Sequence, residues 1–120
     1  KAITLLSDIV KNDSEHINAY LQLGNLLRED DPDRATKIHQ MLTVRQNLSK
    51  ETKVEILKSL SLDYDKVGNF QKAKIEAEKI LKLDNSNHWA FSFLLSIAEK
   101  IEDWEYAEFK AKELSRITPS

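Results

Sequence analysis

A chain of 120 residues with 41% hydrophobic and 32% charged residues has the size and composition of one folded domain, which argues against a disordered chain. Two glycines and two prolines are too few for a β-sandwich or barrel, and the absence of cysteine excludes a disulfide framework and thiolate chemistry. A net charge of −2, with both signs interspersed, gives no reason to expect nucleic acid, and no apolar run reaches the ~20 residues that cross a bilayer.

The first predicted element is a helix over residues 2–11, in which Ala2, Leu6 and Ile9 recur at helical spacing. We interpret residues 2–14 as the second helix, with its turn, of a repeat whose first helix is missing. Because the chain also starts with lysine instead of methionine, we expect it to be a fragment of a longer protein.

Residues 17–47 predict the first complete helix pair, with helices over residues 17 to about 29 and about 33 to 43. Pro32 stands between them, where its fixed backbone angle suits a first helical turn. Gly24 lies inside the first of these helices, although glycine costs about 1 kcal/mol there relative to alanine. We therefore expect another part of the chain to approach Gly24 closely.

A polar insertion of roughly four residues then interrupts the repeat period, which is about 34 residues. We place an inserted loop at residues 48–53, with Ser49 as the N-cap of the next helix; a lengthened helix is the alternative. The central repeat spans residues 54–87, and Gly68 ends its first helix.

The last repeat, residues 88–120, opens with the most apolar helix of the chain and turns at Asp103. It matches the central repeat when the sequence is shifted by one period. The matching pairs are Tyr64 and Ala98, Phe70 and Trp104, Ala73 and Ala107, Ala77 and Ala111.

This helix–turn–helix unit, with small and large apolar residues at fixed positions, resembles the tetratricopeptide repeat. The resemblance implies an all-α superhelix of antiparallel helix pairs, with about three and a half repeats and about seven helices. The small residues would let one helix approach its neighbour, and the large ones would fill the space between adjacent pairs. The small residues are Ala73, Ala77, Ala107 and Ala111, and the large ones Leu57, Tyr64, Phe91 and Leu94.

In that family the first helix of each repeat lines a concave groove that binds peptides. The corresponding positions of this chain are Asn18, Leu21, Gln22, Asn25, Arg28, Glu55, Lys58, Leu62, Asp65, Trp89, Ser92, Phe93 and Ser96. Leu21 and Trp89 stand where the chaperone-binding members need basic residues, so we reject a clamp for a chaperone tail.

Two functions of different classes fit this pattern. In the first, Leu21, Leu62, Trp89 and Phe93 form a partly apolar groove for a protein or peptide segment, although the two aromatic residues could equally belong to the core. In the second, the chain assembles with copies of itself through end helices, on an interface built on Trp104, Tyr106 and Phe109.

No pattern in the chain indicates an enzyme, a cofactor or a metal site. His16, His39 and His88 lie far apart without carboxylates at ligand spacing, and we expect His39 to be a packing residue on an inward helix face. The chain has neither a glycine-rich phosphate loop nor a nucleophile elbow.

Three short segments support a narrower resemblance, to the tetratricopeptide region of the bacterial lipopolysaccharide assembly protein B family. They are Leu23–Leu26, Asp33–Ala35 and Ile38–Gln40, followed by the insertion described above. The turn at Asp30–Pro32 departs from that family, which usually has a glycine there.

The narrower resemblance implies an adaptor in the regulation of lipopolysaccharide synthesis. The parent protein would be anchored in the inner membrane, with its repeats in the cytoplasm and a C-terminal zinc module of rubredoxin type. It would couple a membrane-bound AAA protease to the deacetylase that commits lipid A synthesis. The fragment itself is expected to be cytoplasmic, to touch neither the membrane nor nucleic acid, and to bind a protein or peptide segment.

Overall fold

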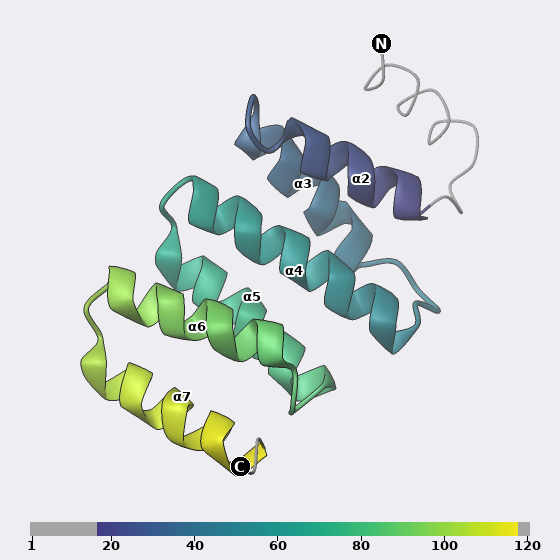
Figure 1. Ribbon diagram of the computed structural model, residues 1–120. Coiled ribbons are helices and arrows are strands. Elements are labelled where there is room, and N and C mark those ends of the chain that lie inside the picture. The colour runs from purple at the N-terminus through teal and green to yellow at the C-terminus, as the bar shows by residue number, and fades with distance from the viewer. Residues whose placement is uncertain (1–16, 118–120) are drawn as a thin grey trace.

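The computed structural model describes residues 17–117, which fold into six α-helices without a β-strand. Figure 1 shows α2, α4 and α6 running side by side, with α3 and α5 behind them and α7 at the C-terminal end. Each helix packs against the next one in the chain. The predicted all-α stack of helix pairs is therefore confirmed. The helices are α2 (Ile17–Leu27), α3 (Pro32–Thr43), α4 (Lys50–Lys66), α5 (Phe70–Leu83), α6 (His88–Lys100) and α7 (Trp104–Ile117).

Short polar side chains start most of these helices by accepting a hydrogen bond from a backbone N–H that the helix leaves unpaired. Asn69 caps α5 and Asn87 caps α6 in this way. At the other end of α4, Gly68 adopts a φ of +79°, which explains why glycine stops this helix. The helix predicted over residues 2–11 lies outside the described residues.

The predicted boundary of the inserted loop is wrong at its C-terminal side. The structure begins α4 at Lys50, so the connection from α3 comprises residues 44–49. The predicted N-cap is confirmed: the Ser49 hydroxyl accepts the backbone N–H of Thr52 at 3.1 Å, so the helix starts directly after Ser49 and residues 50–53 belong to α4. The insertion thus lengthens α4 to 17 residues instead of lengthening the loop through residue 53.

Alanines bring the middle helices together as predicted. Ala73 and Ala77 of α5 are fully buried. The corresponding Ala111 of α7 is exposed, contrary to the prediction, because α7 is the last described helix and packs through one side only. Val67, which forms the C-cap of α4, is 46% exposed.

Candidate functional site

The residues predicted to line a peptide groove lie on α2, α4 and α6, and all but one of them reach the surface. Leu21 is the correction: it is 6% exposed and belongs to a core cluster with Leu42 and Ile56. We call the remaining residues the interaction face. Its exposed members are Asn18, Gln22, Glu55, Ser92 and Ser96, and its partly buried members are Asn25, Arg28, Lys58, Leu62, Asp65, Trp89 and Phe93.

Trp89 and Phe93 lie one turn apart on α6 and stack on each other, with ring centroids 5.0 Å apart and planes 9° apart. Trp89 packs against the apolar cluster around Leu57, and Phe93 packs against the cluster around Leu60. Lys58 of α4 places its ammonium 5.2 Å from the centroid of the Trp89 ring. The aromatic pair therefore belongs partly to the core and partly to the surface.

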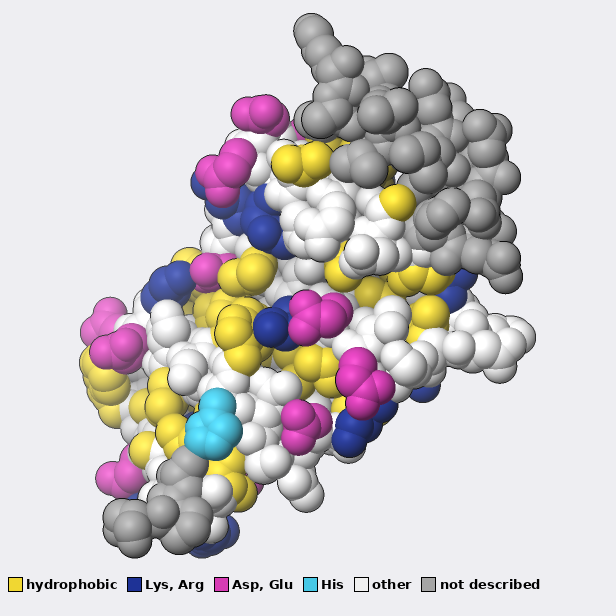
Figure 2. All heavy atoms as spheres, turned by 45° about the vertical axis from the view of Figure 1, so that its right-hand side comes forward, with side chains coloured by type: hydrophobic (Ala, Val, Ile, Leu, Met, Phe, Trp, Pro, Cys, Tyr) yellow, Lys and Arg dark blue, Asp and Glu magenta, His cyan; other side chains and the backbone are white. Residues whose placement is uncertain are grey.

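Ion pairs join the neighbouring helices of this layer. Lys66 of α4 reaches Glu29 in the turn after α2 at 2.7 Å, and Lys100 of α6 reaches Asp65 of α4 at 2.6 Å. The hydrogen bond from Lys66 holds the pKa of the Glu29 carboxyl below its usual value. In Figure 2, hydrophobic side chains spread across the middle of the molecule with basic and acidic side chains in contact among them.

A buried polar network, which the sequence did not predict, links α2, α3 and α4. The side chains of His39 and Asp63 are fully buried, and His39 Nδ1 contacts Asp63 Oδ2. His39 Nε2 lies 3.1 Å from the carbonyl oxygen of Leu21, and Arg28 Nε donates to Asp63 Oδ1 at 2.8 Å. Arg28, predicted as a groove contact, is thus already bound within the chain.

The sequence contained a signal for this network. Asp63 follows Leu60 by three residues and therefore falls on the buried side of α4, where a carboxylate requires a partner. The inward position of His39 was predicted correctly, but its role as an ion-pair partner was not. Two residues that are 24 positions apart can be paired only when the packing of α3 on α4 is known.

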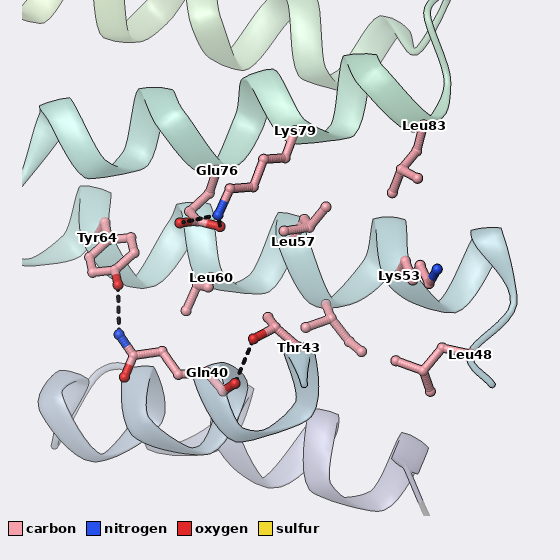
Figure 3. A pocket seen from close by; sticks show the side chains of 11 residues that line it. Gln40, Thr43, Leu48, Lys53, Leu57, Leu60, Tyr64, Glu76, Lys79 and Leu83 are labelled. Atoms are coloured by element: carbon pink, nitrogen blue, oxygen red, sulfur yellow. Dashed lines mark hydrogen bonds and ion pairs between the residues drawn. The ribbon is translucent and has the colours of Figure 1, made fainter. Parts of the chain in front are cut away.

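A hollow of about 360 Å³ lies between α3 and α5 and is shown in Figure 3. Gln40 donates to the Tyr64 hydroxyl at 2.7 Å, and Lys79 pairs with Glu76 at 3.2 Å. Because these polar groups bind one another, few of them are left to bind a ligand, so the interaction face is the stronger candidate. The lining residues are Gln40, Thr43, Leu48, Lys53, Ile56, Leu57, Leu60, Tyr64, Glu76, Lys79 and Leu83.

A second buried polar cluster fixes α7 to α5. Lys110 is 5% exposed and lies 2.9 Å from carboxylate oxygens of both Glu78 and Glu113. Burial lowers the pKa of the Lys110 ammonium, but the two carboxylates outweigh this effect and the pKa is raised. The Tyr106 hydroxyl donates to Glu78, and burial together with this bond raises the pKa of Tyr106. Tyr106 is therefore a half-buried structural residue.

Within residues 17–117, no three His, Cys, Asp or Glu side chains gather closely enough to hold a metal ion. None of the six described helices combines the length and the apolar character that a membrane span requires.

The curated proteins that match this sequence are named lipopolysaccharide assembly protein B. The chain is 30% identical to lipopolysaccharide assembly protein B of Escherichia coli K12, over 98% of this chain and 30% of the relative. It is 34% identical to the protein of that name from Haemophilus influenzae, over 99% of this chain and 32% of the relative. The chain thus spans about 30% of the length of the curated relatives it matches. No family model matches the chain.

Solved structures support the fold alone, since their sequence identities are low. Pseudomonas aeruginosa pilF superposes with a TM-score of 0.75 at 16% identity, covering 96% of this chain and 51% of that chain. MamA AMB-1 gives a TM-score of 0.73 at 15% identity, covering 96% and 61%. The chain therefore has the helical-repeat fold of these structures, and its sequence is similar to part of the lipopolysaccharide assembly protein B relatives.

Proposed function

We propose that the chain is a non-catalytic adaptor that binds a segment of a partner protein on the interaction face. The observation that carries this proposal is the stacked pair of Trp89 and Phe93, whose partly exposed rings lie on the layer of first helices. Aromatic residues that are packed on one side and exposed to solvent on the other often contribute most of the binding energy in protein interfaces.

The charges of this face indicate what the partner segment contains. Asp65 is paired with Lys100, and Lys58 lies 3.5 Å from Glu55 as well as over the Trp89 ring. Because these charges are balanced by neighbours within the chain, a partner gains little by adding another ion pair. We therefore expect the partner segment to contribute mainly apolar side chains, with polar contacts at Ser92 and Ser96.

The biological setting follows from the relatives. Both relatives are named for lipopolysaccharide assembly, so we propose that the adaptor acts in that process on the cytoplasmic side of the inner membrane. In a strain that lacks the protein to which this chain belongs, expressing that protein again should restore the normal level of lipopolysaccharide. A variant whose interaction face is blocked should not restore that level.

The direct test is site-specific photo-crosslinking of the protein in bacterial cells. A photoreactive amino acid is placed at Ser92 or Ser96 of the interaction face, or at the control positions Met41 and Ile75, which are 61% and 53% exposed on second helices. The proposal expects one discrete protein adduct from the first two positions and none from the controls. Equal labelling from all four positions would contradict it.

A blocking variant keeps the core intact. Ser96→Arg adds a long charged side chain to an exposed position of α6, and Gln71→Arg does the same on α5 as a matched control. Because neither residue is buried, we expect both variants to fold normally, and only Ser96→Arg to lose the adduct formed from Ser92.

Self-assembly is a second candidate, which one observation favours. Trp104 and Phe109 of α7 are 60% and 57% exposed, and large exposed aromatic residues often mark an interface. In that case the chain should associate in sedimentation velocity measurements, and Trp104→Ser together with Phe109→Ser should abolish the association. A monomer at all concentrations would exclude this candidate.

A further inference from the structure

We infer that His39 is a positioning residue for the interaction face, because it holds Asp63, and Asp63 in turn holds the Arg28 side chain. His39 does this as an imidazolium, with a hydrogen on both ring nitrogens. Arg28 belongs to the interaction face, whereas His39 lies on α3 beneath it. The consequence for binding rests on the function proposed above, but the protonation and the positioning do not.

Asp63 connects the interior to the surface because its two oxygens have different partners. Oδ2 contacts His39 Nδ1, and Oδ1 accepts the Arg28 Nε–H at 2.8 Å. The Arg28 guanidinium also donates through Nη2 to Asn25 Oδ1 at 2.6 Å and to the Ser59 carbonyl at 3.2 Å. Two sides of the guanidinium are thus held, while 16% of the Arg28 side chain stays open to solvent.

The proton count follows from the partners of the imidazole. The Leu21 carbonyl can only accept a hydrogen bond, so the facing Nε2, at 3.1 Å, must carry a hydrogen. Asp63 also pairs with the guanidinium of Arg28 at 2.8 Å, and a carboxylate in an ion pair is only an acceptor, so Nδ1 must carry a hydrogen too. A neutral imidazole has a single N–H and would leave one of these two buried acceptors facing a lone pair.

Close packing against α2 holds the His39 imidazole in one position. A Cβ placed on Gly24 of α2 would lie 2.4 Å from His39 Nε2, so the ring rests directly on the α2 backbone. The charged groups that face His39 in the described structure are Asp63 from α4 and, beyond it, Arg28 from the turn after α2. The His39 ring therefore explains why residue 24 of α2 is a glycine: a side chain at this position would collide with the imidazole.

Two consequences follow for the interaction face. Without the N–H of His39, Asp63 would be anchored by Arg28 alone, and the carboxylate could rotate together with the guanidinium. The orientation of Arg28 toward a bound segment is thus set by a residue that no partner can touch.

The first test is nitrogen NMR of the 120-residue chain with labelled histidine, at neutral pH. Both ring nitrogens of His39 should show the shifts and proton couplings of an N–H. A His39 signal with one unprotonated nitrogen at neutral pH would overturn the assignment.

The second test follows hydrogen exchange of the Arg28 Nε–H in two variants. His39→Asn keeps an N–H donor near the place of Nδ1, whereas His39→Leu has a similar size and no donor. We expect exchange in His39→Leu to be about tenfold faster than in the natural chain, the equivalent of one hydrogen bond, and His39→Asn to restore most of the protection. His88→Asn is the control, because that histidine is exposed on α6.

The outcomes separate positioning from simple packing. Equal exchange in the natural chain and both variants would contradict the inference, and so would equal acceleration in both variants. Should His39→Leu fail to fold, the exchange rate in His39→Asn and the nitrogen NMR still decide the inference, because a tenfold acceleration in His39→Asn would contradict it. These readouts require no partner, so they stand even if the crosslinking experiment fails.

Discussion

Two junctions between neighbouring helix pairs of this molecule are closed by different chemistry. Where α2 and α3 meet α4, the centre is the fully buried pair of His39 and Asp63. Where α4 and α5 meet α6, the centre is apolar, with Ile80 and Ala90 fully buried and Leu57 nearly so. Hydrogen bonds depend on direction and apolar contacts depend mainly on area, so the first junction defines one geometry more strictly than the second.

The largest effect on stability is expected from a substitution that breaks the polar junction. Asp63→Ala leaves His39 and Arg28 without their shared carboxylate, and removing one partner of a buried ion pair costs about 3–5 kcal/mol of unfolding free energy. Urea unfolding measures this loss. The control is Asp65→Ala, whose carboxylate pairs with Lys100 near the surface and should cost less than about 1 kcal/mol. Similar losses in the two variants would contradict the contrast.

Gly24→Ala should have the next largest effect at the same junction. The added methyl group would meet the imidazole of His39 at 2.4 Å, and overpacking of this kind costs about 1–3 kcal/mol even though alanine favours a helix. Thermal unfolding measures the change. In a His39→Ala background the clash disappears, so the same substitution should then be neutral or stabilising.

Ile80→Val probes the apolar junction. Removing one methyl group from a fully buried side chain leaves a small cavity and should cost about 1 kcal/mol. Denaturant unfolding measures this loss, which is expected to stay the same from pH 6 to pH 8 because the surrounding cluster contains no titratable group. A loss that depends on pH in this range would show that the two junctions are not independent.

The smallest effect is expected at α7, and only at alkaline pH. The pKa of Tyr106 is raised above its usual 10.0 in the folded state, so the folded chain holds this proton more tightly than the unfolded chain. The resulting stability is present below pH 10 and is lost as the pH rises further; Lys110 acts in the same direction above its usual 10.5. Tyr106→Phe should show a shallower loss in urea unfolding between about pH 9 and 11.

Local patterns in the sequence predicted the helices and most of their ends. Apolar spacing predicted the pairs, Gly68 and Ser49 marked where helices end and begin, and the alanines of α5 marked the close contact. These features depend on neighbours within about one turn, so they can be read without the fold. The start of α4 was misplaced because the polar residues 50–53 were assigned to the loop, although Ser49 had been identified as the cap that precedes them.

The sequence by itself determined the repeat, the order of the helices and the face that carries Trp89 and Phe93. Only the tertiary structure decided that Leu21 is buried, that Ala111 is exposed and that Arg28 is bound to Asp63, 35 positions away. The reason is physical: the helical period fixes which side chains share a face. The stacking of one helix on another fixes which of those side chains meet, and this stacking depends on contacts between residues far apart in the chain.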